Sequence, residues 1–352
     1  MRTLQQGAET LDTADAADFT LSDALLPGEE RLFEELLLAE LPHFYDEVDP
    51  SFPRSLMYTA RLGSDDYGYF TLRKRIFVAR RDRVPIGFTV ATYKRGGSVK
   101  MGPTVTVAEL RRTGIGTRFR GAVEAEIARD PRIRKLYLTI SGSNDRTLLF
   151  NLGLGYQVEG VLRGQYRAGQ DEVVLGRIVR PAGEAAVGRN QIPAGSGRAP
   201  EVRQGTVDPD RLAEFMLRRM RSGFAGVDHS FVESIVRALA ADRQVYARKG
   251  KSLLTAYHDG AVRGVGVLVP KRGGAIKLSP LLVDDLGVAR AIVRAACRLA
   301  DDQGRRRIYV VLPIADNSVV ELLLREGFAL EAQLREAYRP GMDTLVLGKC
   351  LC

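Results

Sequence analysis

Hydrophobic positions recur along the chain in two patterns. Some segments have the spacing of an α-helix, and others are short runs typical of β-strands. Apolar residues at helical spacing over 28–44 predict a helix near the N-terminus. Two runs rich in β-branched and aromatic residues, 75–81 and 86–93, flank a turn at Asp82-Arg83 and predict a strand pair. The elements predicted further along are a strand over 99–107, a helix over 114–128, a strand over 135–140, a helix over 145–152, and closing strands over 157–164 and 171–179. This order predicts an α/β (α+β) fold, with a mixed central sheet and helices on both faces.

The same pattern then occurs a second time. The matching segments are 92–107 with 269–284, 134–145 with 306–317, and 154–177 with 326–349. Between the copies, a stretch rich in Gly, Ala and Pro has no apolar periodicity and predicts a linker. We therefore expect a polar leader (1–19), an N-terminal domain (20–180), a linker (181–201) and a C-terminal domain (202–352).

Composition narrows the class of protein and of partner. The chain has 352 residues and a net charge of +9, which suits an anionic partner such as a phosphorylated cofactor or an acidic carrier protein. Its basic residues are scattered rather than interleaved with aromatics, which disfavours a nucleic-acid platform. No apolar run reaches about 18 residues, so no membrane association is expected.

Targeting and redox signals favour the cytoplasm. The first twenty residues lack the apolar segment of a secretory signal. Three cysteines, Cys297, Cys350 and Cys352, form no disulfide framework and fit a reducing compartment. Their spacing, and the distance to His43 and His229 in the sequence, provide no set of metal ligands, so no metal is expected.

One strand-to-helix junction carries candidate chemistry. A helix N-terminus offers unpaired N–H groups and a positive dipole end, and glycines let a phosphate approach the backbone closely. The residues at the junction are Arg111, Arg112, Thr113, Gly114, Ile115, Gly116 and Thr117. The residues alone leave two interpretations open, a phosphate-binding loop and a structural turn. A dinucleotide-binding loop fits less well because Phe119 stands where its third glycine would be.

The order of these motifs resembles the GNAT N-acetyltransferase superfamily, in a tandem layout similar to that of mycothiol synthase. Its pyrophosphate motif matches Arg111, Gly114 and Gly116. Its second motif matches "NDRTLLFNLGLGY", which supplies Asn144, Thr147, Phe150, Asn151, Gly155 and Tyr156. The resemblance covers nearly all of the chain, once per half.

The resemblance implies direct acyl transfer from acyl-CoA, most simply acetyl-CoA, to a primary amine. Two parallel strands, here 99–107 and 135–141, would separate and admit the acyl-pantetheine, helped by Pro103, which has no N–H to donate. The resemblance places the pantetheine and the thioester carbonyl against backbone groups of Val105, Thr106 and Val107. Asn144 would reach the pantetheine arm.

The catalytic residues are harder to predict. The attacking amine must be neutral, so a base or a water chain is needed, and the sequence does not identify it. The family's tyrosine acid is replaced by Asn151, which cannot act as an acid at neutral pH. Tyr166 is one substitute, and a structural role for it stays open.

The second copy lacks the features that would bind CoA. Asp316 and Leu323 replace Asn144 and Asn151, and the paired arginines are absent. Asp284 and Asp285 put negative charge where a pyrophosphate would lie. We expect this copy to bind CoA poorly or not at all and to serve as a scaffold.

Several alternatives stay open at this stage. The acyl donor could instead be an acyl carrier protein or aminoacyl-tRNA, although tRNA offers no pyrophosphate to cradle. The chain could also be a non-catalytic CoA-sensing module. The sequence identifies neither the amine, which could belong to a small molecule or a peptide, nor the acyl length, and it leaves monomer and homodimer open.

Overall fold

The computed structural model describes residues 19–63, 70–182, 190, 192–195, 199–205, 208–220, 223–240 and 250–351. The predicted polar leader lies outside this part of the chain, apart from Phe19. None of the described helices is long and apolar enough to cross a membrane.

The strands and α-helices fall into two series with the same order. The N-terminal half comprises β1 (Thr20–Ser22), α1 (Glu29–Glu40), η1 (Leu41–His43), α2 (Ser51–Arg61), β2 (Thr71–Arg81), β3 (Val84–Lys94), β4 (Ser98–Thr106), η2 (Ala108–Leu110), α3 (Ile115–Ala128), β5 (Lys135–Ser141), α4 (Asp145–Gly153), β6 (Gln157–Arg167) and β7 (Gln170–Ile178). The C-terminal half comprises β8 (Glu201–Gln204), α5 (Pro209–Met220), α6 (His229–Ala240), β9 (Ser252–His258), β10 (Ala261–Pro270), η4 (Arg272–Gly274), β11 (Ala275–Val283), α7 (Leu286–Asp302), β12 (Arg307–Pro313), α8 (Asn317–Arg325), β13 (Ala329–Arg339) and β14 (Met342–Cys350).

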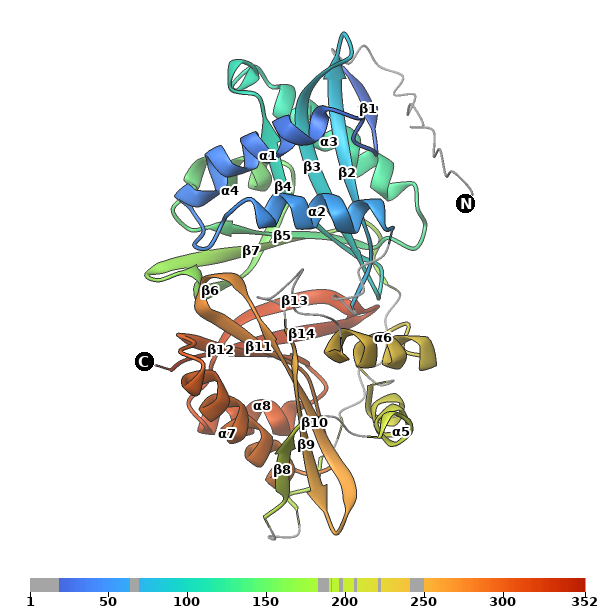
Figure 1. Cartoon of the computed structure of the whole chain (residues 1–352), viewed down its shortest axis with the longest axis vertical. Helices are drawn as coiled ribbons and strands as arrows, with labels where there is room; N and C mark the ends of the chain where they lie inside the picture. The colour runs from blue at the N-terminus through green and yellow to red at the C-terminus, as the bar shows by residue number, and fades with distance from the viewer. Residues whose placement is uncertain are drawn as a thin grey trace.

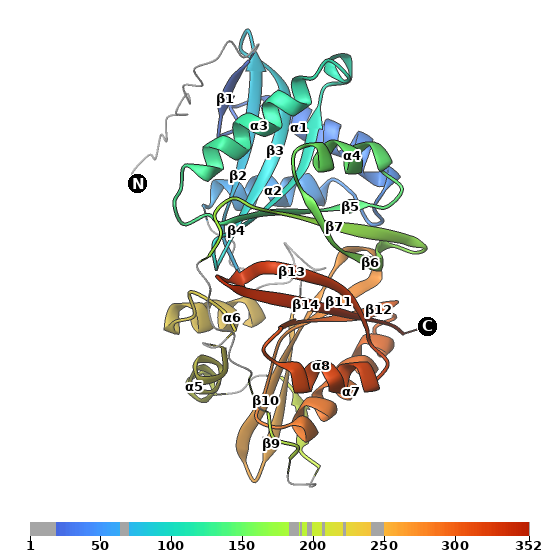
Figure 2. The same cartoon turned by 180° about the vertical axis from the view of Figure 1, so that it is seen from behind.

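The described strands form one continuous mixed sheet, which confirms the predicted α/β class. Its order is β1-β2-β3-β4-β5-β7-β6-β13-β14-β12-β11-β10-β9-β8, so the second series mirrors the first about the centre. The halves join through β6 and β13, where Gly160 pairs with Ala332. Figures 1 and 2 show the two halves stacked along the long axis, with these strands between them.

Helices cover both faces of the N-terminal half. In Figure 1, α1 and α2 lie in front of the sheet, and Figure 2 shows α3 and α4 on the opposite side. The helical period explains the α3 contact, because Ile115, Phe119, Val123 and Ile127 are all buried. Strand β3 is buried over most of its length, as expected for a strand covered on both faces.

The repeated Lys-Arg-Gly-Gly segment has a structural role at the centre. Gly96 has φ 87°, and a Cβ there would lie 2.4 Å from the carbonyl oxygen of Tyr338. Gly273 has φ 71°, and a Cβ there would lie 1.9 Å from the carbonyl oxygen of Tyr166. Each half therefore uses a glycine to bring its backbone against a tyrosine of the other half.

Candidate functional site

Strands β4 and β5 separate as predicted. They pair in parallel at Ser98–Lys135, Val99–Leu136 and Lys100–Tyr137, and the two described strands form no further pair. Strand β4 continues to Thr106 and carries an irregularity in its pairing with β3 between the partners of Thr89 and Ala91. Beyond Lys100, backbone groups of β4 and β5 are therefore available to an extended ligand, apart from the Thr106 carbonyl, which accepts from Arg111.

The helix that follows β4 begins with an open N-terminus. Gly114 is the N-cap of α3, with φ 83°, and no described side chain caps this end. Thr113 Oγ1 instead donates a hydrogen bond to the Leu110 carbonyl at 2.8 Å. A Cβ at Gly116 would meet nothing within 4 Å. In the first turn, the Thr117 N–H donates to the Gly114 carbonyl at 3.1 Å, whereas the Ile115 and Gly116 N–H groups have no partner among the described residues. These two N–H groups and the helix dipole provide what an anion site requires.

The two arginines of this loop differ in their surroundings. Arg111 donates to the Thr106 carbonyl at 3.2 Å and forms an ion pair with Glu40 of α1 at 2.8 Å. Arg112 is exposed and has φ 67°. Arg111 therefore links the end of β4 to α1. Its partner Glu40 lies 71 residues earlier in the chain (111 − 40 = 71), so no local sequence pattern indicates this contact.

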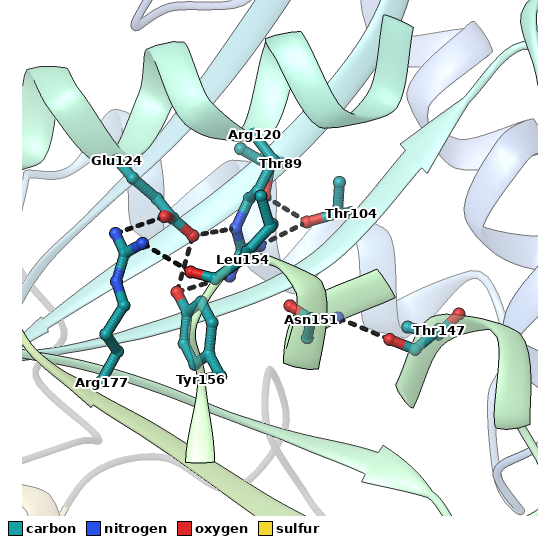
Figure 3. Close-up of polar contacts among 9 residues, drawn as sticks. All are labelled: Thr89, Thr104, Arg120, Glu124, Thr147, Asn151, Leu154, Tyr156 and Arg177. Carbon is teal, nitrogen blue, oxygen red and sulfur yellow. Dashed lines mark hydrogen bonds and ion pairs between the residues drawn. The ribbon is translucent and has the colours of Figure 1, made fainter. Parts of the chain in front are cut away.

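Helix α4 supplies the two asparagines of the second motif. Asn144 is its N-cap, and its Oδ1 accepts from the Thr147 N–H at 3.2 Å. Asn151 Nδ2 donates to the Thr147 carbonyl at 2.8 Å, while its buried Oδ1 has no partner among the described residues. Figure 3 shows this contact along α4. Asn151 therefore presents an unpaired acceptor rather than an acid.

A buried polar network beside these residues was not predicted from the sequence. Arg120 donates to Glu124 at 2.7 Å, to Tyr156 at 3.1 Å and to Thr104 of β4 at 2.9 Å. Tyr156 donates to Glu124 at 2.7 Å, and Arg177 bonds Glu124 at 2.5 Å. Figure 3 shows the network between α3 and the separated strand β4. It fixes the Thr104 side chain at the point where β4 has left β5.

The ionisation of this network follows from its burial and its partners. Burial alone would lower the pKa of Arg120, but Tyr156 and Glu124 outweigh that effect and raise it. Burial also raises the pKa of Tyr156 well above its ordinary value. The network therefore holds a charged arginine and a neutral phenol against Glu124. A signal was present in the sequence, because Arg120 and Glu124 are spaced four apart on the buried face of α3.

Tyr166 lies on the other side of the separated strands. Its ring centroid lies 5.7 Å from that of Tyr45, which follows η1, and 6.0 Å from Lys100 Nζ. Asn151 lies instead on α4, whose Leu148 packs into the core beneath α3. Tyr166 therefore lies with Tyr45 and Lys100, and Asn151 lies on the helix that packs against the core beneath α3.

The equivalent helix of the C-terminal half is closed at its N-terminus. Asp285 is the N-cap of α7, and its carboxylate accepts from the Val288 N–H at 2.8 Å. The Leu286 N–H donates to the Pro193 carbonyl at 2.9 Å. Residues 107–114 connect β4 to α3, whereas only residues 284 and 285 connect β11 to α7. The loop is therefore shorter, and its own carboxylate occupies the place of an anion.

The described residues of the segment between the halves pack near the N-termini of α7 and α8. The Asn190 N–H donates to the Ala315 carbonyl at 2.9 Å, and its side chain donates to Asp316 at 2.6 Å. Ile192 packs against the core beneath α7. Asp284 is neutralised by Arg218 at 3.2 Å and Arg219 at 3.0 Å.

Among the described residues of this half, the positions equivalent to Arg120, Glu124 and Tyr156 carry no polar network. Most buried positions of α3 and α7 match when the two helices are aligned with a sequence offset of 173. In this alignment Val293 is equivalent to Arg120, and Cys297 is equivalent to Glu124. With the offset of 172, Phe328 is equivalent to Tyr156 and Leu323 is equivalent to Asn151.

Among the described residues, no three His, Cys, Asp or Glu side chains gather closely enough to hold a metal ion.

The chain was compared with known proteins. No family model matches it, and neither does any curated protein. Solved structures with a similar fold include a putative acetyltransferase of the GNAT family from Desulfovibrio desulfuricans, with TM-score 0.40 and 18% identity over 46% of this chain and 99% of that one. Another is an aminoglycoside 6'-N-acetyltransferase complexed with coenzyme A, with TM-score 0.37 and 17% identity over 47% and 99%. A third is the ribosomal-protein-S18-alanine N-acetyltransferase from Escherichia coli, with TM-score 0.36 and 14% identity over 47% and 97%.

Proposed function

We propose that this chain is an acyl-CoA-dependent N-acyltransferase with a single acyl-CoA site, in its N-terminal half. The observation that carries the proposal is the separation of β4 from β5 after Lys100 and Tyr137, directly before the uncapped N-terminus of α3. An extended thioester arm needs unpaired strand edges, and a pyrophosphate needs free N–H groups at a helix N-terminus. Both features occur here on adjacent elements.

The ligand roles follow from this geometry. The backbone of Gly114, Ile115, Gly116 and Thr117 would hold the pyrophosphate, with exposed Arg112 nearby. The backbone of Val105 and Thr106 would hold the pantetheine and polarise the thioester carbonyl. Val107, also predicted for this role, already donates its N–H to the Ile86 carbonyl at 3.0 Å. Asn144 would face the pantetheine arm, and the unpaired Asn151 Oδ1 would accept a hydrogen bond from an amide or thiol of the cofactor.

We further propose that the halves are two domains, 20–180 and 202–352, and that the second one is a scaffold. The linker and Asp285 already occupy the N-terminus of α7, which supports this assignment. The amine acceptor would approach from the face that carries Tyr45 and Tyr166.

A thiol-release assay tests the enzymatic part of the proposal. The full-length protein is mixed with acetyl-CoA or longer acyl-CoAs and a panel of small-molecule and peptide amines, and free CoA thiol and acylated amine are measured. We expect thiol release that depends on both substrates, with equal amounts of amide product. Binding of CoA without turnover across the panel would favour a CoA-binding module. Turnover only with acyl carrier protein or aminoacyl-tRNA would assign the other donors.

A further inference from the structure

One buried carboxyl group in the N-terminal half, that of Glu172, forms no ion pair with any residue that the structure describes. Glu172 lies on β7, directly opposite Ser141 of β5, and its side chain is only 1% exposed. Its Oε2 makes no hydrogen bond within the described part of the chain. An unpaired buried carboxyl is costly to the fold, so its presence calls for a reason other than stability.

The strand register places Glu172 on the face of the sheet that carries Tyr45 and Tyr166, from which the amine would approach. Side chains alternate along a strand, so Ser141 and Tyr137 of β5 share one face, and Glu172 joins them as the partner of Ser141. Lys100 is the partner of Tyr137 and shares that face, at the last pair before β4 and β5 separate. Glu172 therefore lies beside the separated strands on the side of Tyr45 and Tyr166.

A second buried glutamate on the adjacent strand shows what a structural carboxylate looks like here. Glu159 of β6 is equally enclosed, but Lys135 contacts its two oxygens at 2.6 and 2.8 Å, and Arg335 approaches at 3.3 Å. The C-terminal half repeats this pair as Glu331 and Arg307. The fold thus keeps the paired carboxylate in both halves.

The unpaired carboxyl is not repeated. At the same offset, β14 carries Thr344 in place of Glu172. Phe224 replaces Tyr45, and its ring lies 5.6 Å from Tyr338, as Tyr45 lies 5.7 Å from Tyr166. The closed half therefore packs well without a carboxyl or a phenol at these positions, so neither is required by the fold.

We propose that Glu172 is the catalytic base that accepts a proton from the ammonium group of the amine substrate. This inference rests on the proposed function and concerns the same site. The proton passes from R–NH₃⁺ to the Glu172 carboxylate, and the freed nitrogen lone pair attacks the thioester carbonyl carbon. The C–N bond forms, the C–S bond breaks, and the departing thiolate takes the second proton of the nitrogen. Glu172 then releases its proton to solvent, which leaves amide and CoA thiol.

The ionisation of the surrounding groups supports this role. Burial raises the pKa of Glu172 to about 8, and Lys100 opposes the shift. An alkyl ammonium has a pKa of about 10.4, so proton transfer is far less uphill than to an ordinary glutamate. The titratable groups on the same face as Glu172 are Lys100 of β4, Tyr137 of β5, Tyr45 after η1 and Tyr166 of β6. Burial raises the pKa of Tyr45, and Glu172 and Tyr166 raise it further, so the Tyr45 phenol stays neutral.

The same shift predicts how stability depends on pH. A carboxyl whose pKa is higher in the folded than in the unfolded state binds more protons when folded. Its contribution to stability is full below its ordinary pKa of 4.5 and is lost as pH rises to about 8. Glu172→Gln should therefore raise the melting temperature relative to wild type, by an increment that grows from pH 5 to pH 8 and then levels off.

The test compares Glu172→Gln with the matched variant Glu159→Gln in the full chain. With acetyl-CoA and an amine that wild type uses, Glu172→Gln should lower kcat about 100-fold or more at pH 7 and leave acetyl-CoA binding unchanged. Its deficit should shrink toward pH 10, where the amine is already neutral. Glu159→Gln should lower the melting temperature and keep the wild-type pH profile.

The outcomes separate this inference from the proposed function. If wild type acylates an amine and Glu172→Gln does so at a similar rate with the same pH profile, the role of Glu172 is wrong although the function stands. If wild type acylates nothing, the proposed function fails. The stability test does not depend on activity. If the melting temperatures of Glu172→Gln and wild type differ by a constant amount from pH 5 to pH 8, the assignment of Glu172 as an unpaired buried acid is wrong.

Discussion

The N-termini of α3 and α7 occupy equivalent places in the two series of elements, yet one N-terminus is uncapped and the other is capped. Gly114 leaves α3 uncapped, whereas the Asp285 carboxylate and the Pro193 carbonyl satisfy the first turn of α7. Both helices pack on the same kind of sheet with the same buried spacing. The fold therefore does not need an open helix end, and the open one is best explained by a ligand.

The same comparison extends to the interior beneath the two helices. The α3 side holds the Arg120–Glu124–Tyr156 network, and the α7 side holds Val293, Cys297 and Phe328 at the matching positions. An apolar interior is therefore a sufficient solution for this fold. A buried ion network is rarely retained for stability alone, so we interpret this one as positioning Thr104 at the separated strand.

The largest expected effect tests this interior. Glu124→Gln leaves Arg120 buried without its carboxylate, and we expect the free energy of unfolding to fall by about 3–5 kcal/mol. Equilibrium urea unfolding measures the change. The variant Arg120→Val/Glu124→Cys/Tyr156→Phe, which copies the C-terminal half, should recover most of the loss. A Glu124→Gln protein as stable as wild type would show that the network is not coupled as described.

The next effect tests the open helix end. A Cβ at Gly116 would meet no atom within 4 Å, so Gly116→Glu adds a side chain at an open position and puts a carboxylate beside the place where the pyrophosphate would lie. We expect Gly116→Glu to weaken acetyl-CoA binding at least about 100-fold, or roughly 2.7 kcal/mol, in a calorimetric titration. Gly121→Glu makes the same change in the middle of α3, also in open space, and should bind normally. Equal affinity of both variants would remove the pyrophosphate from this helix end.

The smallest effect tests the closed helix end. Asp285→Ala removes the N-cap of α7, and we expect the free energy of unfolding to fall by about 1 kcal/mol. Asp285→Asn can still accept the hydrogen bond and should remain close to wild type. Neither variant should gain an acetyl-CoA site, because Pro193 and Asn190 still fill the position. A second site appearing in Asp285→Ala would mean that this one carboxylate alone keeps CoA out.

Most of the fold could be predicted from the sequence because it follows from periodicity and repetition. The strands at 75–81, 86–93 and 99–107 and the helix over 114–128 are confirmed within a few residues. The separation of the parallel strands is confirmed as well. The continuous central sheet was not predicted, because the pairing of Gly160 with Ala332 joins strands that no local pattern connects.

The site was less predictable because its contacts are long-range. The partner of Arg111 is Glu40 on α1, and the partners of Asp316 and Leu286 lie in the linker, which has no apolar period. Arg120 and Glu124 were missed because a charged pair at helical spacing usually marks a solvated face. Glu172 could not be identified because its unpaired state depends on what surrounds it, and a strand sequence does not show that.

The most direct measurement of the central claim is a calorimetric titration of acetyl-CoA into the full-length protein. One helix end is open and the other is already satisfied by the chain itself, so we expect one acetyl-CoA per chain. Gly116→Glu should eliminate that single binding event. Two sites of equal affinity, or one site that survives Gly116→Glu, would contradict the account.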